Sequence, residues 1–212
     1  MKIFLDSANP GEVRTLVAQY AIDGITMNPG LLAREKVRLE TVLATLCELS
    51  PGPVSVPVRA VEADAIVAEG RALAAHSDRI TIKIPIHAAG LRAIAKLHSE
   101  GIRTHATVCC SANQGLLAAR AGADYVSPLV GRLDETGVSG MDLVAQLIEI
   151  YDQYDYDTQI MVASLRTTTH VQEAALLGVD AVTLPRRLLE ELAQHPLSDR
   201  VHEEFLAAWK RL

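Results

Sequence analysis

One lysine lies in the middle of an apolar segment, Ile80–Pro85, whose sequence is Ile-Thr-Ile-Lys-Ile-Pro. The β-branched residues around this lysine predict a buried strand. Burying an ammonium group without a partner is costly, so a buried lysine is usually either paired or kept neutral for chemistry. The other four lysines lie near the chain start or in polar, helical surroundings. Lys83 is therefore the first candidate for a reactive amine.

Other polar side chains recur at or near the carboxyl ends of similar aliphatic segments. Strand side chains alternate between two faces, so residues two positions apart, such as His105 and Thr107, share a face. A single polar residue on such a face is most simply a hydrogen-bonded core residue. Recurrence on several strands instead indicates a site. The candidates are Asp6, Thr26, Asn28, Arg59, Lys83, His105, Thr107, Ser127, Arg132, Ser164 and Arg166.

These residue types suit Schiff-base chemistry at Lys83. Burial and nearby cations lower the pKa of a lysine amine, so that the neutral amine can attack a carbonyl group. The resulting iminium ion accepts electrons and lets the adjacent carbon–carbon bond break or form. A carboxylate such as Asp6 could then act as general base or acid toward a substrate hydroxyl. Arg132 and Arg166, with Ser164 between them in the chain, are typical of a clamp for phosphate or a similar anion.

Alternating secondary structure must bring these strand ends together. The aliphatic segments alternate with segments whose apolar residues recur every three or four positions, for example Glu62–His76 and Met141–Tyr154. This alternation predicts βαβ units and a parallel sheet. Eight units predict a single (β/α)8 TIM barrel, with its site at the carboxyl ends of the strands. The expected strands are Lys2–Asp6, Gly24–Met27, Val54–Arg59, Ile80–Pro85, Arg103–Cys109, Tyr125–Val130, Gln159–Ser164 and Ala181–Pro185.

The last segment, Ser198–Leu212, is expected to form an extra C-terminal helix with Ser198 as its N-cap. An apolar stripe that includes the only tryptophan runs along it. This stripe either packs against its own barrel or serves as a contact arm onto a neighbouring subunit. No Gly/Ser-rich linker divides the chain, so we expect one domain over residues 1–212. The stripe consists of Val201, Phe205, Ala208, Trp209 and Leu212.

Composition excludes several classes of partner. The 212-residue chain is 49% hydrophobic, has a formal net charge of −6 and contains no basic run, which argues against nucleic acid or an anionic membrane. Its apolar runs are too short to span a bilayer. The three cysteines do not suit a disulfide framework, and the histidines show no metal-ligand spacing. We therefore expect a cytoplasmic protein with free thiols and no bound metal.

Six short segments resemble the transaldolase family, particularly its short members, which include fructose-6-phosphate aldolases and small transaldolases. The order and spacing of the segments agree from residue 2 to about residue 190. Any one segment would be weak evidence, but six in register are specific. The segments are Phe4–Ala8, Gly24–Pro29, Ile82–Pro85, Gly101–Thr107, Ala118–Asp134 and Ala163–Arg166.

The resemblance implies a role for each matching residue near the lysine. Lys83 matches the Schiff-base lysine of the family, and Asp6 matches its acid/base carboxylate. Thr26 and Asn28 match residues that hold the hydroxyls of a dihydroxyacetone unit. Thr107 matches a threonine that helps to hold a catalytic water.

The resemblance also implies a substrate and an assembly. Ser127 lies where the family keeps a small residue against the donor, and Arg132, Ser164 and Arg166 match the binders of a distal phosphate. The implied reaction transfers or releases a three-carbon ketose fragment from a sugar phosphate such as fructose 6-phosphate. It requires no metal or organic cofactor. Short family members assemble as pentamers or decamers, so we expect a homo-oligomer whose terminal helix contacts a neighbour.

Several positions depart from the family pattern, among them Met27 and Gly30, which alter its usual Thr-Thr-Asn-Pro-Ser run. Pro57 replaces a glutamate or glutamine that holds the catalytic water together with the threonine. Leu129 replaces an aromatic residue, and the absence of the aldolases' tyrosine there favours transfer over simple aldol cleavage. His105 stands where transaldolases usually have asparagine and aldolases an apolar residue, and we count it among the substrate-binding candidates.

Arg59 lies two residues beyond Pro57 and would share its inward face if the strand remains regular. It could then replace the polar function lost at Pro57, lower the pKa of Lys83, or bind an anion on a different donor. A rim arginine that points to solvent is the alternative. For the whole chain, the alternatives are a Schiff-base aldolase with another donor and a barrel that binds sugar phosphates without turnover.

Overall fold

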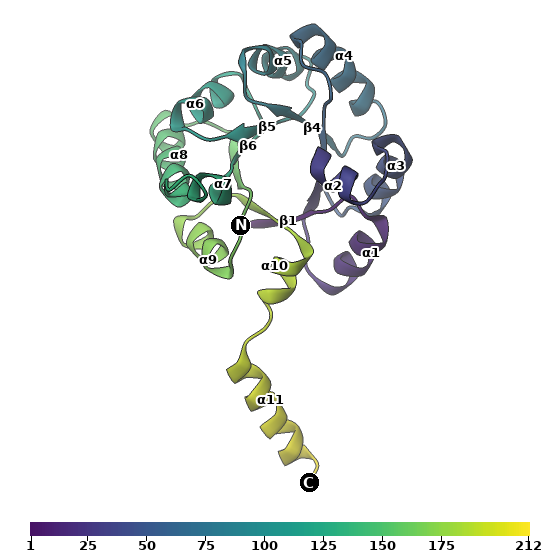
Figure 1. The fold of residues 1–212 in the computed structure, drawn as a ribbon, viewed down its shortest axis with the longest axis vertical. Helices are drawn as coiled ribbons and strands as arrows, with labels where there is room; N and C mark the ends of the chain where they lie inside the picture. The colour runs from purple at the N-terminus through teal and green to yellow at the C-terminus, as the bar shows by residue number, and fades with distance from the viewer.

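The computed structural model describes residues 1–212 and contains a closed barrel of eight parallel strands (Figure 1). The strands follow one another around the barrel in chain order, and the last pairs with the first. The predicted (β/α)8 barrel is therefore confirmed. The strands are β1 (Lys2–Asp6), β2 (Gly24–Thr26), β3 (Val54–Pro57), β4 (Ile80–Pro85), β5 (Thr104–Cys109), β6 (Tyr125–Pro128), β7 (Gln159–Val162) and β8 (Ala181–Leu184).

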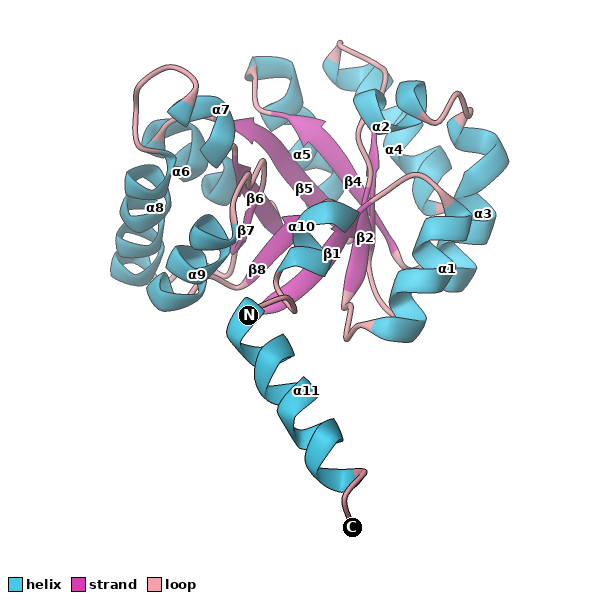
Figure 2. Cartoon of the chain, turned by 60° about the horizontal axis from the view of Figure 1, so that its bottom comes forward, coloured by secondary structure: helices cyan, strands magenta, loops and turns pink.

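Most of the helices surround the barrel and connect successive strands, and the last two follow the final strand (Figure 2). None of them has the length and hydropathy needed to cross a membrane. The helices are α1 (Pro10–Gln19), α2 (Pro29–Arg34), α3 (Leu39–Leu49), α4 (Ala63–Ala74), α5 (Ala88–Ser99), α6 (Ala112–Arg120), α7 (Val130–Asp134), α8 (Gly140–Tyr154), α9 (Thr168–Leu177), α10 (Arg186–Glu191) and α11 (Pro196–Trp209).

Local sequence explains where several helices begin and end. Asn9, Ser111 and Thr167 precede α1, α6 and α9, and their side chains accept hydrogen bonds from backbone N–H groups of the first turn. Gly178 ends α9 with a φ of 79°, a left-handed conformation that glycine adopts without steric cost. These caps fix the helix ends, and thereby the loops that lead into and out of each strand.

The strands are aliphatic because both of their faces are buried. Every residue of β3 and β6 is buried, as are all residues of β4 except Pro85. Inside the barrel, Phe4, Tyr125, Met161 and Ala181 form a small separate cluster. The rings of Phe4 and Tyr125 meet edge to face, with their centroids 5.9 Å apart. This cluster fills the interior near the amino ends of β6 and β8.

Five predicted strands are too long at their carboxyl ends, by one or two residues each. β3 ends at Pro57 instead of Arg59, and β7 ends before Ser164. β5 has an irregular register against β6, and Val108 within it has a φ of 62°, an unusual conformation for a β-branched residue. Ser164 has a φ of 61°. Backbone irregularities of this kind often occur at functional sites, and Val108 and Ser164 both lie at the carboxyl ends of the strands.

α11 extends away from the barrel (Figures 1 and 2). The helix begins at Pro196, and Nδ1 of His195 accepts a hydrogen bond of 3.1 Å from the backbone N–H of Leu197. The prediction of Ser198 as N-cap is therefore wrong. No residue of α11 is buried, and Trp209 is 72% exposed. The interpretation in which the apolar stripe packs against its own barrel is wrong as well.

Candidate active site

A pocket of about 520 Å³ opens among the carboxyl ends of the strands. This volume is typical of sites for small molecules. Thr26, Arg59, His105 and Ser127 do not line it. The remaining predicted site residues do, and they are Asp6, Asn28, Lys83, Thr107, Arg132, Ser164 and Arg166.

Lys83 reaches the pocket from β4, with Pro57 of β3 and His105 of β5 as its register partners. The residue is only 7% exposed, and its Nζ donates one hydrogen bond of 3.2 Å to the carbonyl oxygen of Met27. Burial lowers the pKa of the Lys83 amine, and the negative charge of Asp6 partly opposes this shift. The neutral form, which is the nucleophilic one, is therefore favoured relative to an exposed lysine.

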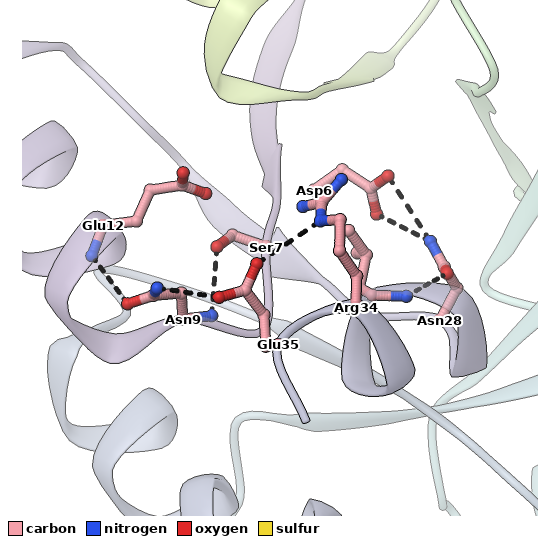
Figure 3. Close-up of polar contacts among 8 residues, drawn as sticks. Asp6, Ser7, Asn9, Glu12, Asn28, Arg34 and Glu35 are labelled. Carbon is pink, nitrogen blue, oxygen red and sulfur yellow. Dashed lines mark hydrogen bonds and ion pairs between the residues drawn. The ribbon is translucent and has the colours of Figure 1, made fainter. Parts of the chain in front are cut away.

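The Asp6 carboxylate at the end of β1 accepts hydrogen bonds from two side chains. Oγ1 of Thr26 donates to it at 3.0 Å. Nδ2 of Asn28 donates to it at 3.3 Å (Figure 3). Because the Thr26 hydroxyl uses its proton on Asp6, the hydroxyl of Thr183, 2.6 Å away, must donate to Thr26. Asp6, Thr26, Asn28 and Thr183 are called the Asp6 network below.

Two features suit the Asp6 network to proton transfer. Burial raises the pKa of Asp6, while the charge of Lys83 and the hydrogen bonds from Thr26 and Asn28 lower it. A raised pKa suits a carboxyl group that must both take up and release a proton. Asn28 is itself fixed, because its Oδ1 accepts a hydrogen bond of 3.0 Å from the N–H of Leu31 at the start of α2. Its amide nitrogen is thereby directed at Asp6.

A second group of hydrogen-bonded side chains, Ser55, His105 and Ser127, lies inside the barrel and is fully buried. It is called the His105 network below. Nδ1 of His105 is 2.6 Å from the Ser55 hydroxyl, and Nε2 is 2.7 Å from the Ser127 hydroxyl. Ser127 donates its own proton to the carbonyl oxygen of Met161 at 2.7 Å, so it accepts from Nε2. Nε2 of the imidazole therefore carries a proton, and in the neutral ring Nδ1 accepts from the Ser55 hydroxyl.

His105 and Ser127 were expected to contact a ligand, and the structure places them differently. Both are buried and neither lines the pocket. Burial lowers the pKa of His105 well below its ordinary value, and the charge of Lys83 on the neighbouring strand lowers it further. His105 therefore supports the strand next to Lys83 as a neutral residue.

Arg132 on α7 and Arg166 after β7 come together at the pocket rim. Both contact Glu135: Nη1 of Arg132 at 3.2 Å and Nη2 of Arg166 at 2.9 Å. Ser164, two residues before Arg166 in the chain, also lines the pocket. Two arginines share one carboxylate, so this rim keeps a net positive charge and unused N–H donors toward the pocket. The expected anion clamp is geometrically possible.

Thr107 of β5 also lines the pocket, and so do two of the residues that depart from the family pattern. Pro57 and Leu129 are both lining residues, and neither side chain can form a hydrogen bond. Thr107 therefore has no polar counterpart at position 57 with which to hold a water molecule. The wall on this side of the pocket is more apolar than the family pattern implies.

The expectation that Arg59 points into the barrel is wrong. Because β3 ends at Pro57, the alternation of faces does not continue to Arg59. A carboxylate oxygen of Glu69 accepts hydrogen bonds from the backbone N–H groups of Arg59 and Ala60, both at 2.9 Å, which turns the chain outward. The Arg59 side chain is 63% exposed and pairs with Glu40. This arrangement is the rim arginine of the alternative interpretation.

Three residues of the site were missed from the sequence. Thr183 completes the Asp6 network, Glu135 joins the two arginines, and Arg34 lines the pocket from α2. Alternation along the expected strand Ala181–Pro185 could have placed Thr183 on the inner face. Arg34 and Glu135 lie in or just after short helices that follow strands, where no periodic pattern indicates which way a side chain points.

Comparisons with known proteins agree with this geometry. Residues 3–211 match the family described as Transaldolase/Fructose-6-phosphate aldolase. A probable transaldolase of Anaeromyxobacter sp. (strain Fw109-5) is 46% identical over 212 residues, which cover 100% of this chain and 99% of the relative. Probable transaldolases of Desulfotalea psychrophila and Myxococcus xanthus are 45% and 46% identical, again over 100% of this chain and over 99% and 96% of theirs. The chain therefore belongs to the transaldolase/fructose-6-phosphate aldolase family of enzymes.

Proposed function

We propose that the protein is a transaldolase that uses Lys83 to form a Schiff base with a ketose phosphate such as fructose 6-phosphate. The observation that carries this proposal is the buried Lys83 amine, whose pKa is lowered by burial, beside the partly buried Asp6 carboxyl group in one pocket. Few other roles account for a lysine within a buried strand that forms no ion pair with a carboxylate.

The proposed reaction begins when the neutral Lys83 amine attacks the ketose carbonyl and expels water, leaving an iminium ion. Asp6 then takes the proton of the hydroxyl on the far side of the scissile bond. The carbon–carbon bond breaks, its electron pair enters the iminium system to give an enamine, and an aldehyde leaves. In transfer, the enamine attacks a second aldehyde and Asp6 returns the proton. Hydrolysis of the new iminium frees Lys83.

Binding of the phosphate end is assigned to Arg132, Ser164 and Arg166. The shared contact with Glu135 leaves both guanidinium groups at the rim, where a phosphate of an extended sugar bound at Lys83 can reach them. The apolar wall formed by Pro57 and Leu129 offers no group that would hold water against the enamine. We therefore favour transfer to an aldehyde over release of free dihydroxyacetone.

Borohydride trapping tests the proposal. The protein is incubated with fructose 6-phosphate, reduced with borohydride and analysed by peptide mass spectrometry. We expect a three-carbon or six-carbon adduct on Lys83 that disappears in Lys83→Met. Lys96→Met, which removes an exposed lysine of α5, is the matched control and should label normally. Absence of labelling in the unchanged protein would contradict the Schiff-base proposal and support a barrel that binds sugar phosphates without turnover.

A second assay separates transfer from cleavage. With labelling established, fructose 6-phosphate is supplied with and without erythrose 4-phosphate, and the products are measured. Turnover only when the acceptor is present supports the transaldolase. Equal turnover without it supports an aldolase that releases the three-carbon fragment.

We also propose that α11 contacts a second copy of this chain, in a homo-oligomer of five or ten subunits as the family resemblance implies. Phe205 and Trp209 are 62% and 72% exposed on a helix that buries none of its residues on its own barrel. Light scattering of the unchanged protein should give a multiple of the 22.9 kDa chain mass. Phe205→Glu should reduce the mass, whereas Lys210→Glu at the helix end should not. A monomeric unchanged protein would contradict this assembly.

A further inference from the structure

Arg34 is a cation of the pocket to which the proposed reaction gives no role. It is the last residue of α2, the short helix that follows β2, and it lines the pocket. Its charge acts on the Asp6 carboxyl group, so the guanidinium lies near the reacting end of the site. Asp6 nevertheless accepts its hydrogen bonds from Thr26 and Asn28, not from Arg34.

The position of Arg34 is fixed by a chain of contacts from α1 (Figure 3). Nδ2 of Asn9, the N-cap of α1, donates a hydrogen bond of 2.9 Å to Glu35, and the other carboxylate oxygen of Glu35 contacts Nε of Arg34 at 3.3 Å. Glu35 is the less exposed partner, at 24% against 62% for the Arg34 side chain. Glu35 is therefore the anchored end of the pair, and it holds the guanidinium by one edge.

The two terminal nitrogens of Arg34 remain available to a ligand. The Nε contact with Glu35 is the only side-chain hydrogen bond of Arg34 in the chain. A guanidinium has five N–H donors in a planar arrangement that suits two oxygens of a phosphate or carboxylate group. An arginine held at Nε with its terminal nitrogens free is thus prepared for an anion.

Arg34 faces the arginine clamp from across the barrel. In a closed barrel of eight strands in chain order, β2 and β6 are opposite each other, and β4 lies midway between them. Arg34 follows β2 and Arg132 follows β6, while Lys83 belongs to β4. Figure 1 shows α2 and α7, which carry these two arginines, on opposite sides of the central opening. An extended ligand bound at Lys83 would therefore have a cation at each end.

We propose that Arg34 forms a second anion subsite, so that the pocket binds open-chain sugar derivatives with an anionic group at both ends, such as a hexose bisphosphate. This inference rests on the proposed use of the pocket for a sugar phosphate. One anionic group lies against Arg132 and Arg166, and the other lies against the terminal nitrogens of Arg34. A sugar phosphate with one anionic end uses the first subsite alone.

Two probes without a carbonyl group test the subsite. Glucitol 6-phosphate carries one anionic end and glucitol 1,6-bisphosphate carries two, and neither can form a Schiff base. Their dissociation constants for the unchanged protein are measured by calorimetry. We expect the bisphosphate to bind about tenfold more tightly, as one charge-assisted contact supplies. Binding of these probes does not depend on chemistry at Lys83. A failed preference for the bisphosphate therefore contradicts the Arg34 subsite alone, and failed borohydride trapping contradicts the Schiff-base proposal alone.

Variants assign the preference to Arg34. Arg34→Met should weaken the bisphosphate about tenfold and leave the monophosphate unchanged, whereas Arg132→Met should weaken both. Arg34→Lys keeps the charge and should retain part of the preference. Arg14→Met, which removes an exposed arginine of α1, is the matched control. Equal binding of the two probes by the unchanged protein, or a preference that survives Arg34→Met, would show that Arg34 serves only as a surface partner of Glu35.

Discussion

The Asp6 network and the His105 network occupy the same barrel and are built from similar parts, yet they differ in charge and access. The Asp6 network contains a carboxyl group and reaches the pocket through Asp6, Asn28 and Thr183. The His105 network is sealed from the pocket, and both nitrogens of its imidazole have a partner. The charge of Lys83 acts on both Asp6 and His105, and Lys83 lies on the strand next to His105.

The difference shows how one barrel separates reactivity from stability. In the Asp6 network, burial raises the pKa of Asp6 by more than its hydrogen bonds lower it. The environment is therefore unfavourable for the ionised carboxylate. In the His105 network every proton has a defined acceptor, and the buried histidine is stable as a neutral group. Disrupting the first network should therefore affect turnover, and disrupting the second should affect folding.

The largest expected effect is on turnover. Asp6→Asn keeps the size of the side chain but removes the group that takes up and returns the proton. We expect the transfer rate to fall about 10²- to 10⁴-fold, the usual contribution of a general acid or base. Steady-state assays with fructose 6-phosphate and erythrose 4-phosphate measure it. Asp64→Asn, on the exposed surface of α4, should leave the rate unchanged. If Asp6→Asn lowers the transfer rate less than tenfold, the Asp6 network is not the catalytic one of the two.

The next effect is on stability. His105→Leu leaves the Ser55 hydroxyl without its partner, while Ser127 still donates to Met161. We expect a loss of about 1–3 kcal/mol in the free energy of unfolding, the cost of one unsatisfied buried group. Denaturant titration measures the loss. Adding Ser55→Ala to His105→Leu should restore part of it, because the unsatisfied hydroxyl is then absent. If the double variant is the less stable of the two, the cost does not arise from Ser55.

The smallest effect is a change in pH dependence. Folded His105 stays neutral at pH values where an unfolded histidine takes up a proton, because burial lowers its pKa. The unfolded state then binds more protons, so His105 lowers the free energy of unfolding as the pH falls below about 6.5, by up to about 1.4 kcal/mol per pH unit. Asp6, whose pKa is raised, contributes with the opposite sign.

Comparing variants isolates the contribution of His105. His105→Asn should lose less stability than the unchanged protein between pH 6.5 and pH 5, while His76→Asn, an exposed histidine near the end of α4, should follow the unchanged protein. Denaturant titrations at several pH values give the slopes. Equal slopes for the unchanged protein and His105→Asn would mean that folded His105 takes up a proton after all.

Much of the fold and part of the site could be predicted because both depend on periodicity. The alternation of aliphatic strands and amphipathic helices predicts the barrel, and the strand ends place Lys83, Asp6 and Thr107 at one pocket. The alternation of side chains between two faces can be extended only as far as the strand continues. Arg59 was misplaced because the Glu69 carboxylate, ten residues away in sequence, takes the backbone N–H groups after Pro57.

The remaining errors have a different physical cause. His105 shares a face with Thr107 in a regular strand, but inward residues differ in depth, and only the last of them reach the pocket. Depth depends on where the interior is filled, as it is by Tyr125, whose ring lies 5.9 Å from that of His105. The position of the Arg34 side chain depends on the contact of Glu35 with Asn9. This contact joins the ends of two helices, and no local sequence pattern predicts it.

The exposed position of Trp209 makes α11 an internal optical probe. The chain has no other tryptophan, so its indole emission comes from this one site, the last residue of the helix. In a single chain the indole is in water, and burial against another subunit would shift its emission to shorter wavelength. Dilution followed by fluorescence would then follow the association of subunits without a label, while the five tyrosines, three of them on or beside α8 and none on α11, serve as an internal reference.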